Sequence, residues 1–227
     1  MHTKEKPKQF LEVYNKPIII YTLEYFEKNE EIDAIVISCV KEWIPYLSDL
    51  IYKYRIEKVK KIVSGGETGQ LSIYNGLVAA KDIAGNESVI VLIHDGVRPL
   101  INSELLSKNI ACVKKHGNAI TVGIVKETIL VVDDNEHIEF VPARDKSRVA
   151  KAPQSFWLDD ILSVHEKALN EGITNYIDSC TMMQAYNIPL YMVEGPYENI
   201  KITTPDDYYT MRSILEAKEN AQIYGFE

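Results

Sequence analysis

The sequence predicts an α/β protein: a three-layer α/β/α sandwich around a mainly parallel sheet. Short apolar runs rich in β-branched residues alternate with longer segments whose apolar residues recur at helical spacing. A chain of 227 residues is also long enough to bury a sizeable core in one domain of this type. We therefore expect a single domain over residues 1–227.

The first half of the chain predicts three strands and three helices in alternation. The strands are the apolar runs at 32–39, 59–63 and 89–93, and the helices cover about 17–26, 43–54 and 72–80. Pro17 suits the first turn of a helix, where no amide hydrogen is needed. The run at 89–93 is apolar throughout, as is typical of a strand buried on both faces of a parallel sheet.

The second half continues the alternation and adds a hairpin. Helices are expected at 104–116, 157–170, from about 176 and from Pro205 to about 218, and strands at 119–125 and 190–194. Residues 128–132 and 137–141 alternate in polarity around Asp-Asp-Asn-Glu, a hairpin pattern. Such an arm over 126–145 has little core of its own, so it either lies on the domain or reaches a partner chain.

Net charge limits the kinds of ligand this protein can bind, and cysteine content indicates the cellular compartment. The formal net charge of −8 argues against non-specific binding of nucleic acid or membrane. An anionic ligand would have to meet a local basic cluster. Cys39, Cys112 and Cys180 form neither a disulfide framework nor a metal-ligand pattern. With no signal peptide or long apolar span, the expected location is the cytoplasm.

The central strand ends abruptly in His94-Asp-Gly-Val-Arg-Pro99. In open α/β sheets the ligand crevice lies just beyond the carboxyl ends of the strands. Asp95 could therefore serve a metal ion there, and Arg98 an anion. An ordinary solvated ion pair explains the same residues, and the pattern alone leaves both interpretations open.

A second candidate site is the segment from Gly65 and Gly66 to Ser72. Glycine lets the backbone approach a ligand closely, and a helix N-terminus favours anions. The spacing matches neither a Walker loop nor a dinucleotide fingerprint. A plain strand-to-helix turn is the alternative.

Six short motifs occur in order along the chain, and together they carry a resemblance. They are Pro-Lys-Gln-Phe at 7–10, Gly65-Gly66 with Ser72, the motif at 94–99, Val-Lys-Glu-Thr at 125–128, Ala-Pro-Gln-Ser-Phe at 152–156 and Asn-Ile-Lys-Ile-Thr-Thr-Pro-Asp-Asp at 199–207. In this series the chain resembles the cytidylyltransferases that charge polyol phosphates with CTP. These are the 2-C-methyl-D-erythritol 4-phosphate and ribitol-5-phosphate enzymes.

The resemblance covers essentially the whole chain and implies a Rossmann-like nucleotidyltransferase fold. It implies transfer of CMP from CTP to a polyol phosphate, with release of pyrophosphate and with Mg²⁺ as cofactor. It also implies a homodimer joined through the 126–145 arm.

The resemblance further assigns residues to the two substrates. On the nucleotide side it implies Lys8 and Lys201 at the phosphates, Asp95 at the nucleotide and its Mg²⁺, and Gly65, Gly66 and Ser72 at the cytidine. On the polyol side it implies Arg98, Thr128 and Arg144 at the polyol phosphate and Asp178 at the polyol hydroxyls. The cations suit a reaction whose transition state gathers negative charge on phosphate oxygens.

Three features depart from the family pattern. The family opens with a strand and a glycine-rich loop of the type Leu-Ala-Ala/Gly-Gly-x-Gly-x-Arg-Met that wraps the triphosphate, and Met1 stands where that methionine would be. Gly69 occupies a position where the family usually has arginine, and Ala152 replaces the threonine of Thr-Pro-Gln. The alternative hypothesis is therefore a catalytically impaired, dimeric nucleotide-binding remnant without its glycine-rich loop.

The segment Asp178-Ser-Cys slightly favours ribitol 5-phosphate as the acceptor, with the methylerythritol substrate as the alternative.

Overall fold

The computed structural model describes residues 6–224, so Met1 and the other terminal residues lie outside the described part of the chain. The helices are α1 (Ile18–Lys28), α2 (Ile44–Tyr54), α3 (Gly69–Ala84), α4 (Ser103–His116), α5 (Leu158–Asn170), α6 (Ser179–Ala185) and α7 (Pro205–Tyr224). Short 3₁₀ turns cover η1 (Lys8–Phe10), η2 (Lys41–Trp43) and η3 (Arg144–Lys146). The strands are β1 (Glu12–Val13), β2 (Lys16–Pro17), β3 (Ile35–Cys39), β4 (Val59–Ser64), β5 (Ile90–Ile93), β6 (Asn118–Ile124), β7 (Val131–Val132), β8 (Ile138–Phe140), β9 (Arg148–Trp157) and β10 (Met192–Glu194).

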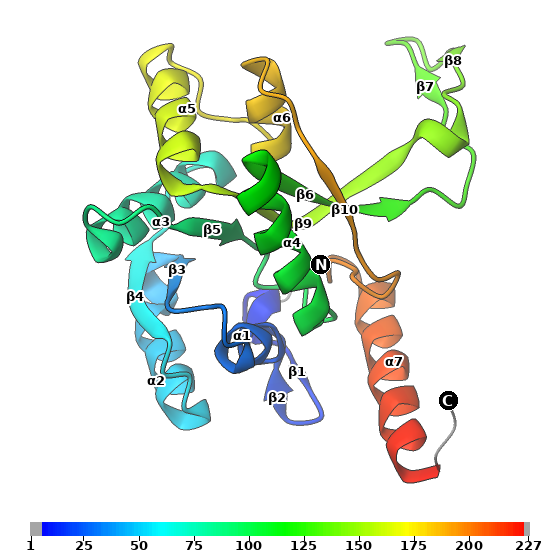
Figure 1. Ribbon diagram of the computed structural model, residues 1–227. Coiled ribbons are helices and arrows are strands. Elements are labelled where there is room, and N and C mark those ends of the chain that lie inside the picture. The colour runs from blue at the N-terminus through cyan, green and yellow to red at the C-terminus, as the bar shows by residue number, and fades with distance from the viewer. Residues whose placement is uncertain (1–5, 225–227) are drawn as a thin grey trace.

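The main sheet has the strand order β10-β6-β9-β5 (Figure 1). Strands β10 and β6 are parallel, whereas β9 runs antiparallel to both β6 and β5. A separate parallel pair is formed by β3 and β4. The α/β class is confirmed: β10, β6 and β5 run in one direction, and the sheet is mixed only because β9 runs against them.

Strand β9, which is antiparallel to both of its neighbours, was not expected from the sequence. Its residues include Lys151, Pro153 and Gln154, which break the apolar pattern expected of a central strand. Pairing with a neighbour on each side makes this segment a strand in spite of its composition. The run at 89–93 was expected in a parallel setting, but β5 pairs antiparallel with β9 and its residues are only partly buried.

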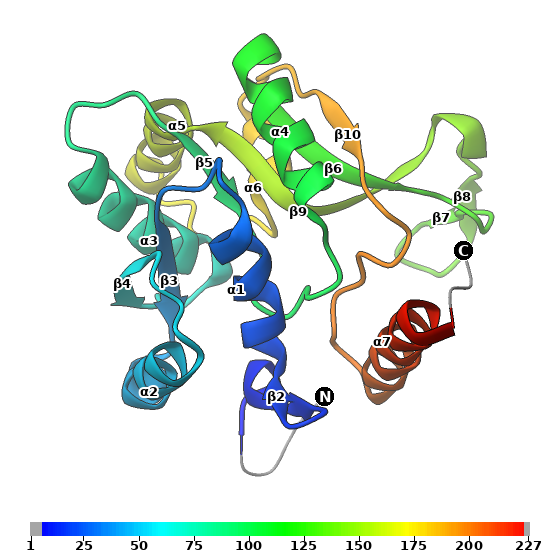
Figure 2. The same ribbon diagram turned by 60° about the horizontal axis from the view of Figure 1, so that its bottom comes forward.

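Helices cover both faces of the main sheet, as Figure 2 shows. Ala119 of β6 packs with α4 in one core cluster, whereas its neighbour Ile120 packs with α3, α5 and α6 in another. Successive strand residues point to opposite faces, so the two clusters lie on opposite sides of the sheet. This is the expected three-layer arrangement.

A buried polar network fixes α4 on its face. Asn109 Nδ2 donates to Thr121 Oγ1 at 3.1 Å, and Ser155 Oγ donates to Asn109 Oδ1 at 3.1 Å. All three residues are fully buried. Hydrogen bonds satisfy these groups, which would otherwise destabilise the core.

The first helices differ from the expected boundaries by a few residues. Helix α3 begins at Gly69 rather than at Ser72, because Thr68 caps it: the Thr68 hydroxyl accepts a hydrogen bond from Leu71 N at 3.2 Å. Helix α1 follows Pro17, as expected, and Thr22 Oγ1 donates to Gly96 O at 3.1 Å. That contact ties α1 to the turn after β5.

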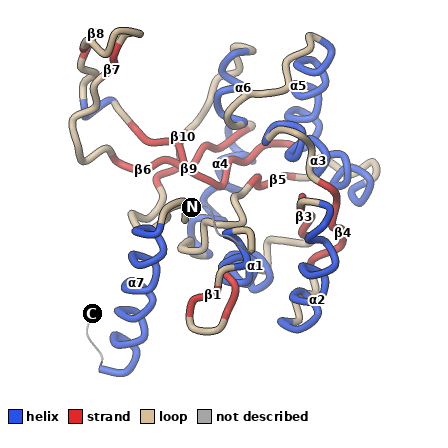
Figure 3. The backbone as a smooth tube through the Cα atoms, turned by 180° about the vertical axis from the view of Figure 1, so that it is seen from behind, coloured by secondary structure: helices blue, strands red, loops and turns tan. Residues whose placement is uncertain are grey.

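The 126–145 segment projects from the body as an arm that ends in the β7–β8 hairpin (Figures 1 and 3). Its apolar side chains Ile129, Leu130, Val132, Ile138, Phe140 and Val141 are all exposed.

Among residues 6–224, no helix is long and apolar enough to cross a bilayer.

Candidate functional site

The motif at 94–99 follows the end of β5, and its carboxylate is held between two cations. Asp95 Oδ1 lies 2.7 Å from Lys201 Nζ, and Asp95 Oδ2 lies 3.2 Å from Arg98 Nε. Within the turn, Arg98 N donates to Asp95 O at 3.0 Å. The sequence places Asp95 and Arg98 together, and the fold adds Lys201 from the segment before α7.

Charge and burial set the protonation of this group. Burial alone would raise the pKa of Asp95, but the hydrogen bond and charge of Lys201, with the charge of Arg98, hold it below its ordinary value. Arg98 is only 8% exposed and also donates from Nη1 to Asn199 O at 3.1 Å. The carboxylate therefore stays ionised at neutral pH.

Lys8 lies directly before a segment that packs against the segments of this ion pair. It begins the 3₁₀ turn 8–10, and Leu11, directly after that turn, packs against the core cluster of Val97 and Ile202. Ile202 N in turn donates to Val97 O at 2.8 Å. The segments that carry Lys8, Asp95 and Lys201 therefore converge.

Gly65, Gly66 and Ser72 form a closed turn at the start of α3. Gly66 N donates to Ser72 Oγ at 3.0 Å, and Ser72 Oγ donates to Thr68 O at 2.9 Å. A Cβ on Gly66 would lie 2.4 Å from the Cβ of Leu71, so only glycine fits there without movement. The structure thus brings these three predicted residues together.

Asp178 is the N-cap of α6, and a glutamine holds its side chain in place. Asp178 Oδ1 accepts from Thr181 N at 2.8 Å, and Asp178 Oδ2 accepts from Gln154 Nε2 at 3.0 Å. Gln154 Oε1 accepts from Cys180 N at 2.8 Å. Gln154 lies in the Ala-Pro-Gln-Ser-Phe motif, but no role was predicted for it, since only the fold brings β9 to α6.

The two arm residues stand apart from these contacts. Arg144 is exposed and donates from Nη1 to Lys126 O at 3.4 Å. Thr128 is exposed on the arm. The hydrogen bonds and ion pairs of the described chain do not join either residue to Asp95, Arg98 or Lys201.

Two further lysines lie beside the 195–199 loop and were not singled out in the sequence. Lys126 Nζ lies 3.5 Å from the centroid of the Tyr197 ring, and Lys151 Nζ donates to Tyr197 O at 3.4 Å. No sequence signal marks Lys151, because the strand that carries it, β9, was not expected from the local pattern.

Asp95 is the carboxylate that could contact a metal ion in this site. Residues 6–224 contain no group of three or more His, Cys, Asp or Glu side chains that could hold a metal ion. Mg²⁺ commonly binds one or two carboxylates together with substrate phosphates. The donor set therefore fits a Mg²⁺ ion shared with a nucleotide and does not form an all-protein cage.

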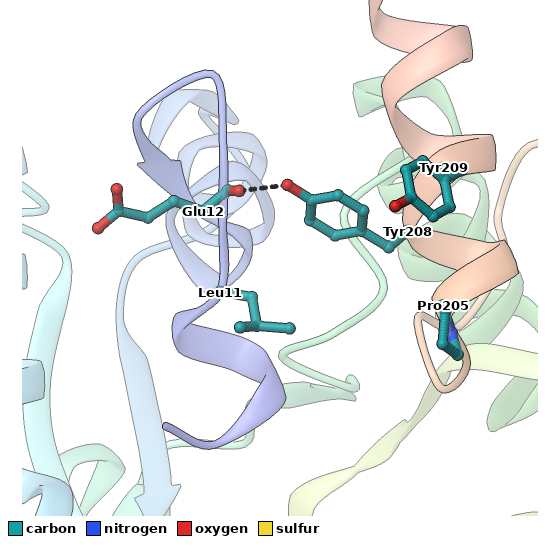
Figure 4. Close-up of a pocket in the computed structure, with 5 residues that line it drawn as sticks. All are labelled: Leu11, Glu12, Pro205, Tyr208 and Tyr209. Carbon is teal, nitrogen blue, oxygen red and sulfur yellow. Dashed lines mark hydrogen bonds between the residues drawn. The ribbon is translucent and has the colours of Figure 1, made fainter. Parts of the chain in front are cut away.

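A groove of about 190 Å³ lies between the β1 segment and α7, and Figure 4 shows the residues that line it. They are Leu11, Glu12, Pro205, Tyr208 and Tyr209. Tyr208 Oη donates to Glu12 O at 2.7 Å across it. None of the predicted site residues lines this groove, and it offers no cationic side chain for a phosphate.

Comparison with known proteins places these features in a family. Residues 1–217 match the family model of IspD, 2-C-methyl-D-erythritol 4-phosphate cytidylyltransferase. The chain is 54% identical over 225 residues to a ribitol-5-phosphate cytidylyltransferase of Streptococcus agalactiae serotype III, which covers 99% of this chain and 94% of that protein. It is 40% identical over 209 residues to a 2-C-methyl-D-erythritol 4-phosphate cytidylyltransferase of Clostridium botulinum, covering 92% of this chain and 89% of that one.

A solved structure agrees with both sequence comparisons. The 4-diphosphocytidyl-2C-methyl-D-erythritol synthase of Anaerococcus prevotii superposes with a TM-score of 0.81 at 30% identity, over 90% of this chain and 88% of that chain. The Rossmann-like nucleotidyltransferase fold that the motifs implied is thereby confirmed. The chain belongs to the IspD family of cytidylyltransferases.

Proposed function

We propose that this protein transfers CMP from CTP to ribitol 5-phosphate, with release of pyrophosphate and formation of CDP-ribitol. The observation that carries the choice of acceptor is the difference in identity: 54% to a ribitol-5-phosphate enzyme against 40% to a methylerythritol-phosphate enzyme. A match that extends over 99% of the chain does not favour the alternative of an impaired remnant. The cytoplasmic location stays a prediction.

Transfer of CMP requires that the protein position the two substrates and stabilise negative charge, and it needs no covalent catalysis. An oxygen of the acceptor phosphate attacks the α-phosphorus of CTP in line. A new P–O bond forms as the bond from the α-phosphorus to the bridging oxygen of the β-phosphate breaks, and that oxygen leaves with the pyrophosphate. Preorganised cations stabilise the charge that gathers on these oxygens.

On the nucleotide side, Lys8 and Lys201 would contact the phosphates. Lys201 is held by Asp95 at 2.7 Å, which keeps its ammonium in place until a triphosphate competes for it. Asp95 would share a Mg²⁺ ion with the phosphate oxygens, and the ion would supply positive charge against the leaving pyrophosphate. The turn of Gly65, Gly66 and Ser72 would meet the cytidine.

On the acceptor side, Arg98 and Arg144 would bind the phosphate, with Thr128 as a further hydrogen-bond donor. Asp178 would accept hydrogen bonds from the ribitol hydroxyls. Because Thr128 and Arg144 lie on the projecting arm, we propose that they complete the site of a second copy in a homodimer. The exposed apolar side chains of the arm support this, since large apolar patches on a surface mark interfaces.

Purified protein incubated with CTP, Mg²⁺ and either polyol phosphate tests the proposal. Pyrophosphate release measures turnover, and mass spectrometry identifies the product. We expect CDP-ribitol, with kcat/KM for ribitol 5-phosphate at least tenfold above that for 2-C-methyl-D-erythritol 4-phosphate. A preference for the methylerythritol substrate would overturn the choice of acceptor, and absence of turnover with both would revive the remnant hypothesis.

A further inference from the structure

Lys151 occupies an unusual place in the main sheet, within a bulge of β9. Ile120 of β6 pairs with Gln154, whereas Val122 pairs with Ala150, so residues 151–153 of β9 face a single residue of β6. A bulge of this kind re-aims a side chain and is common beside binding sites. Here it sends Lys151 along the neighbouring strand.

Gly123 leaves the room that this side chain fills. A Cβ built on Gly123 would lie 2.7 Å from Lys151 Cε and 3.2 Å from its Nζ. The ammonium therefore lies directly over the backbone of β6. A side chain at position 123 would have to displace it.

The Lys151 ammonium has few partners for its three donors. Its hydrogen bond to Tyr197 O is long, at 3.4 Å, and among residues 6–224 no carboxylate oxygen lies within the 4.0 Å of an ion pair. Burial lowers the pKa of Lys151, the charge of Arg98 lowers it further, and Glu198 opposes them. The hydrogen bond to Tyr197 O and the charge of Glu198 therefore offset only part of the cost of desolvating this cation.

Other lysines of the chain show the contrast. Lys16, Lys61, Lys81 and Lys108 each contact a carboxylate oxygen at 2.6–2.9 Å. Arg98 and the strand that carries Lys151 meet at Asn199: Arg98 Nη1 donates to Asn199 O at 3.1 Å, and Asn199 Nδ2 donates to Ala152 O at 2.8 Å. Arg98 uses Nε and Nη1 in its hydrogen bonds, and its charge lowers the pKa of Lys151. In a chain with a net charge of −8, two cations on adjoining segments favour an anionic ligand.

We propose that Lys151, together with Arg98, binds the phosphate group of the acceptor, and that Gly123 is glycine to make this contact possible. The proposal rests on the proposed function for the identity of that anion. Lys201 is tied to Asp95 at 2.7 Å, whereas Lys151 and Lys126 both contact Tyr197 near the base of the arm.

Three substitutions separate the effect of the Lys151 charge from the effect of its position. Lys151→Met removes the charge and keeps an unbranched chain, Lys151→Arg keeps the charge, and Gly123→Ala keeps the charge but moves it. We expect Lys151→Met to raise the KM for ribitol 5-phosphate roughly 10- to 100-fold, as for one charge-assisted hydrogen bond, with the KM for CTP within about twofold of wild type. Lys151→Arg should recover most of the affinity, and Gly123→Ala should raise the same KM.

Lys61→Met is the matched control, because Lys61 is an exposed lysine whose partner is Asp82. We expect it to leave both KM values unchanged. Thermal melting should show that Lys151→Met folds at least as stably as wild type, since a desolvated ammonium has been removed. An unchanged KM for ribitol 5-phosphate, or a rise confined to the KM for CTP, would overturn the proposal.

Calorimetric titration with inorganic phosphate and with ribitol 5-phosphate makes the test independent of turnover. If wild type binds either ligand and Lys151→Met binds it at least tenfold more weakly, the anion site stands even where the CTP reaction fails. If wild type turns over CTP but wild type and Lys151→Met bind ribitol 5-phosphate equally, the proposed function is supported and the role of Lys151 is overturned. Binding of inorganic phosphate that Lys151→Met leaves unchanged would also overturn it.

Discussion

Lys201 and Asp95 form an ion pair at 2.7 Å between the segment before α7 and the turn after β5. Burial would raise the pKa of Asp95, and the hydrogen bond and charge of this lysine make the largest contribution that lowers it. The pair joins two segments that lie far apart in the chain. It therefore couples the position of the carboxylate to the position of one predicted phosphate-binding cation.

Asp95→Asn tests the role of that carboxylate. The amide still accepts a hydrogen bond, but it no longer attracts a metal ion or orients Lys201 by charge. We expect kcat/KM for CTP to fall roughly a hundredfold, by analogy with the loss of one preorganised electrostatic group. Steady-state pyrophosphate release at limiting Mg²⁺ measures it.

The control for this substitution is Asp82→Asn. Asp82 pairs with Lys61 at 2.9 Å on the surface, so the change removes an ion pair of similar length without touching the site. Exposed pairs contribute little, and turnover should stay at the wild-type rate. Wild-type turnover in Asp95→Asn would show that the site is misplaced.

Gln154→Leu tests whether the amide positions Asp178. The substitution removes the donor to Asp178 Oδ2 and leaves Cys180 N without its acceptor. We expect the KM for ribitol 5-phosphate to rise about tenfold while the KM for CTP stays constant, because one misdirected hydrogen-bonding group costs about that much. Kinetics with each substrate varied in turn separate the two constants.

Ser155→Ala provides the comparison, since Ser155 is the next residue of β9 and its hydroxyl donates to Asn109 Oδ1 of α4 at 3.1 Å. It should lower the melting temperature without a change in either KM. If Gln154→Leu also lowered stability alone, with both KM values unchanged, the glutamine would have no positioning role.

Phe140→Glu tests the arm as a dimer contact. Phe140 is 53% exposed at the hairpin, and a buried charge at an interface destabilises association strongly. We expect wild type to sediment as a dimer at micromolar concentration and the variant as a monomer with lower activity. Ile83→Glu, at another exposed apolar side chain, should remain dimeric. A wild-type protein that sediments as a monomer would contradict the dimer.

His165 predicts a pH dependence of stability. The side chain is 1% exposed, neither ring nitrogen has a hydrogen-bond partner in the described chain, and burial lowers the pKa of His165 to about 4. In the unfolded chain the pKa is about 6.5. The unfolded state therefore binds the proton first, so this contribution to stability is complete above pH 6.5 and is lost as the pH falls toward 4.

His165→Leu should remove that dependence. Between pH 7.5 and pH 5 we expect the free energy of unfolding to fall by about 2 kcal/mol more in wild type than in the variant, as measured by urea denaturation. The buried His94, whose pKa burial also lowers to about 4, is present in both proteins and cancels in the difference. Equal pH profiles would show that the pKa of His165 is not lowered in the folded state.

Local chemistry in the sequence determined much of this protein. Apolar periodicity and proline positions predicted the α/β class and most helices to within a few residues, because those signals act between near neighbours in the chain. The motif at 94–99 already placed a carboxylate and a guanidinium at the end of a strand. Family membership also followed from motifs in order, since it depends on residue types and not on contacts.

Only the tertiary structure decided which of these charges have partners. Asp95 meets Lys201, and Gln154 meets Asp178, because the fold brings together segments far apart in sequence. Strand β9 forms because it is paired on both sides, which no local pattern encodes. In the sequence, nothing distinguishes Lys151 from an ordinary surface lysine. Its partial burial, with no carboxylate oxygen at ion-pair distance in the described chain, depends on the three-dimensional packing of its neighbours.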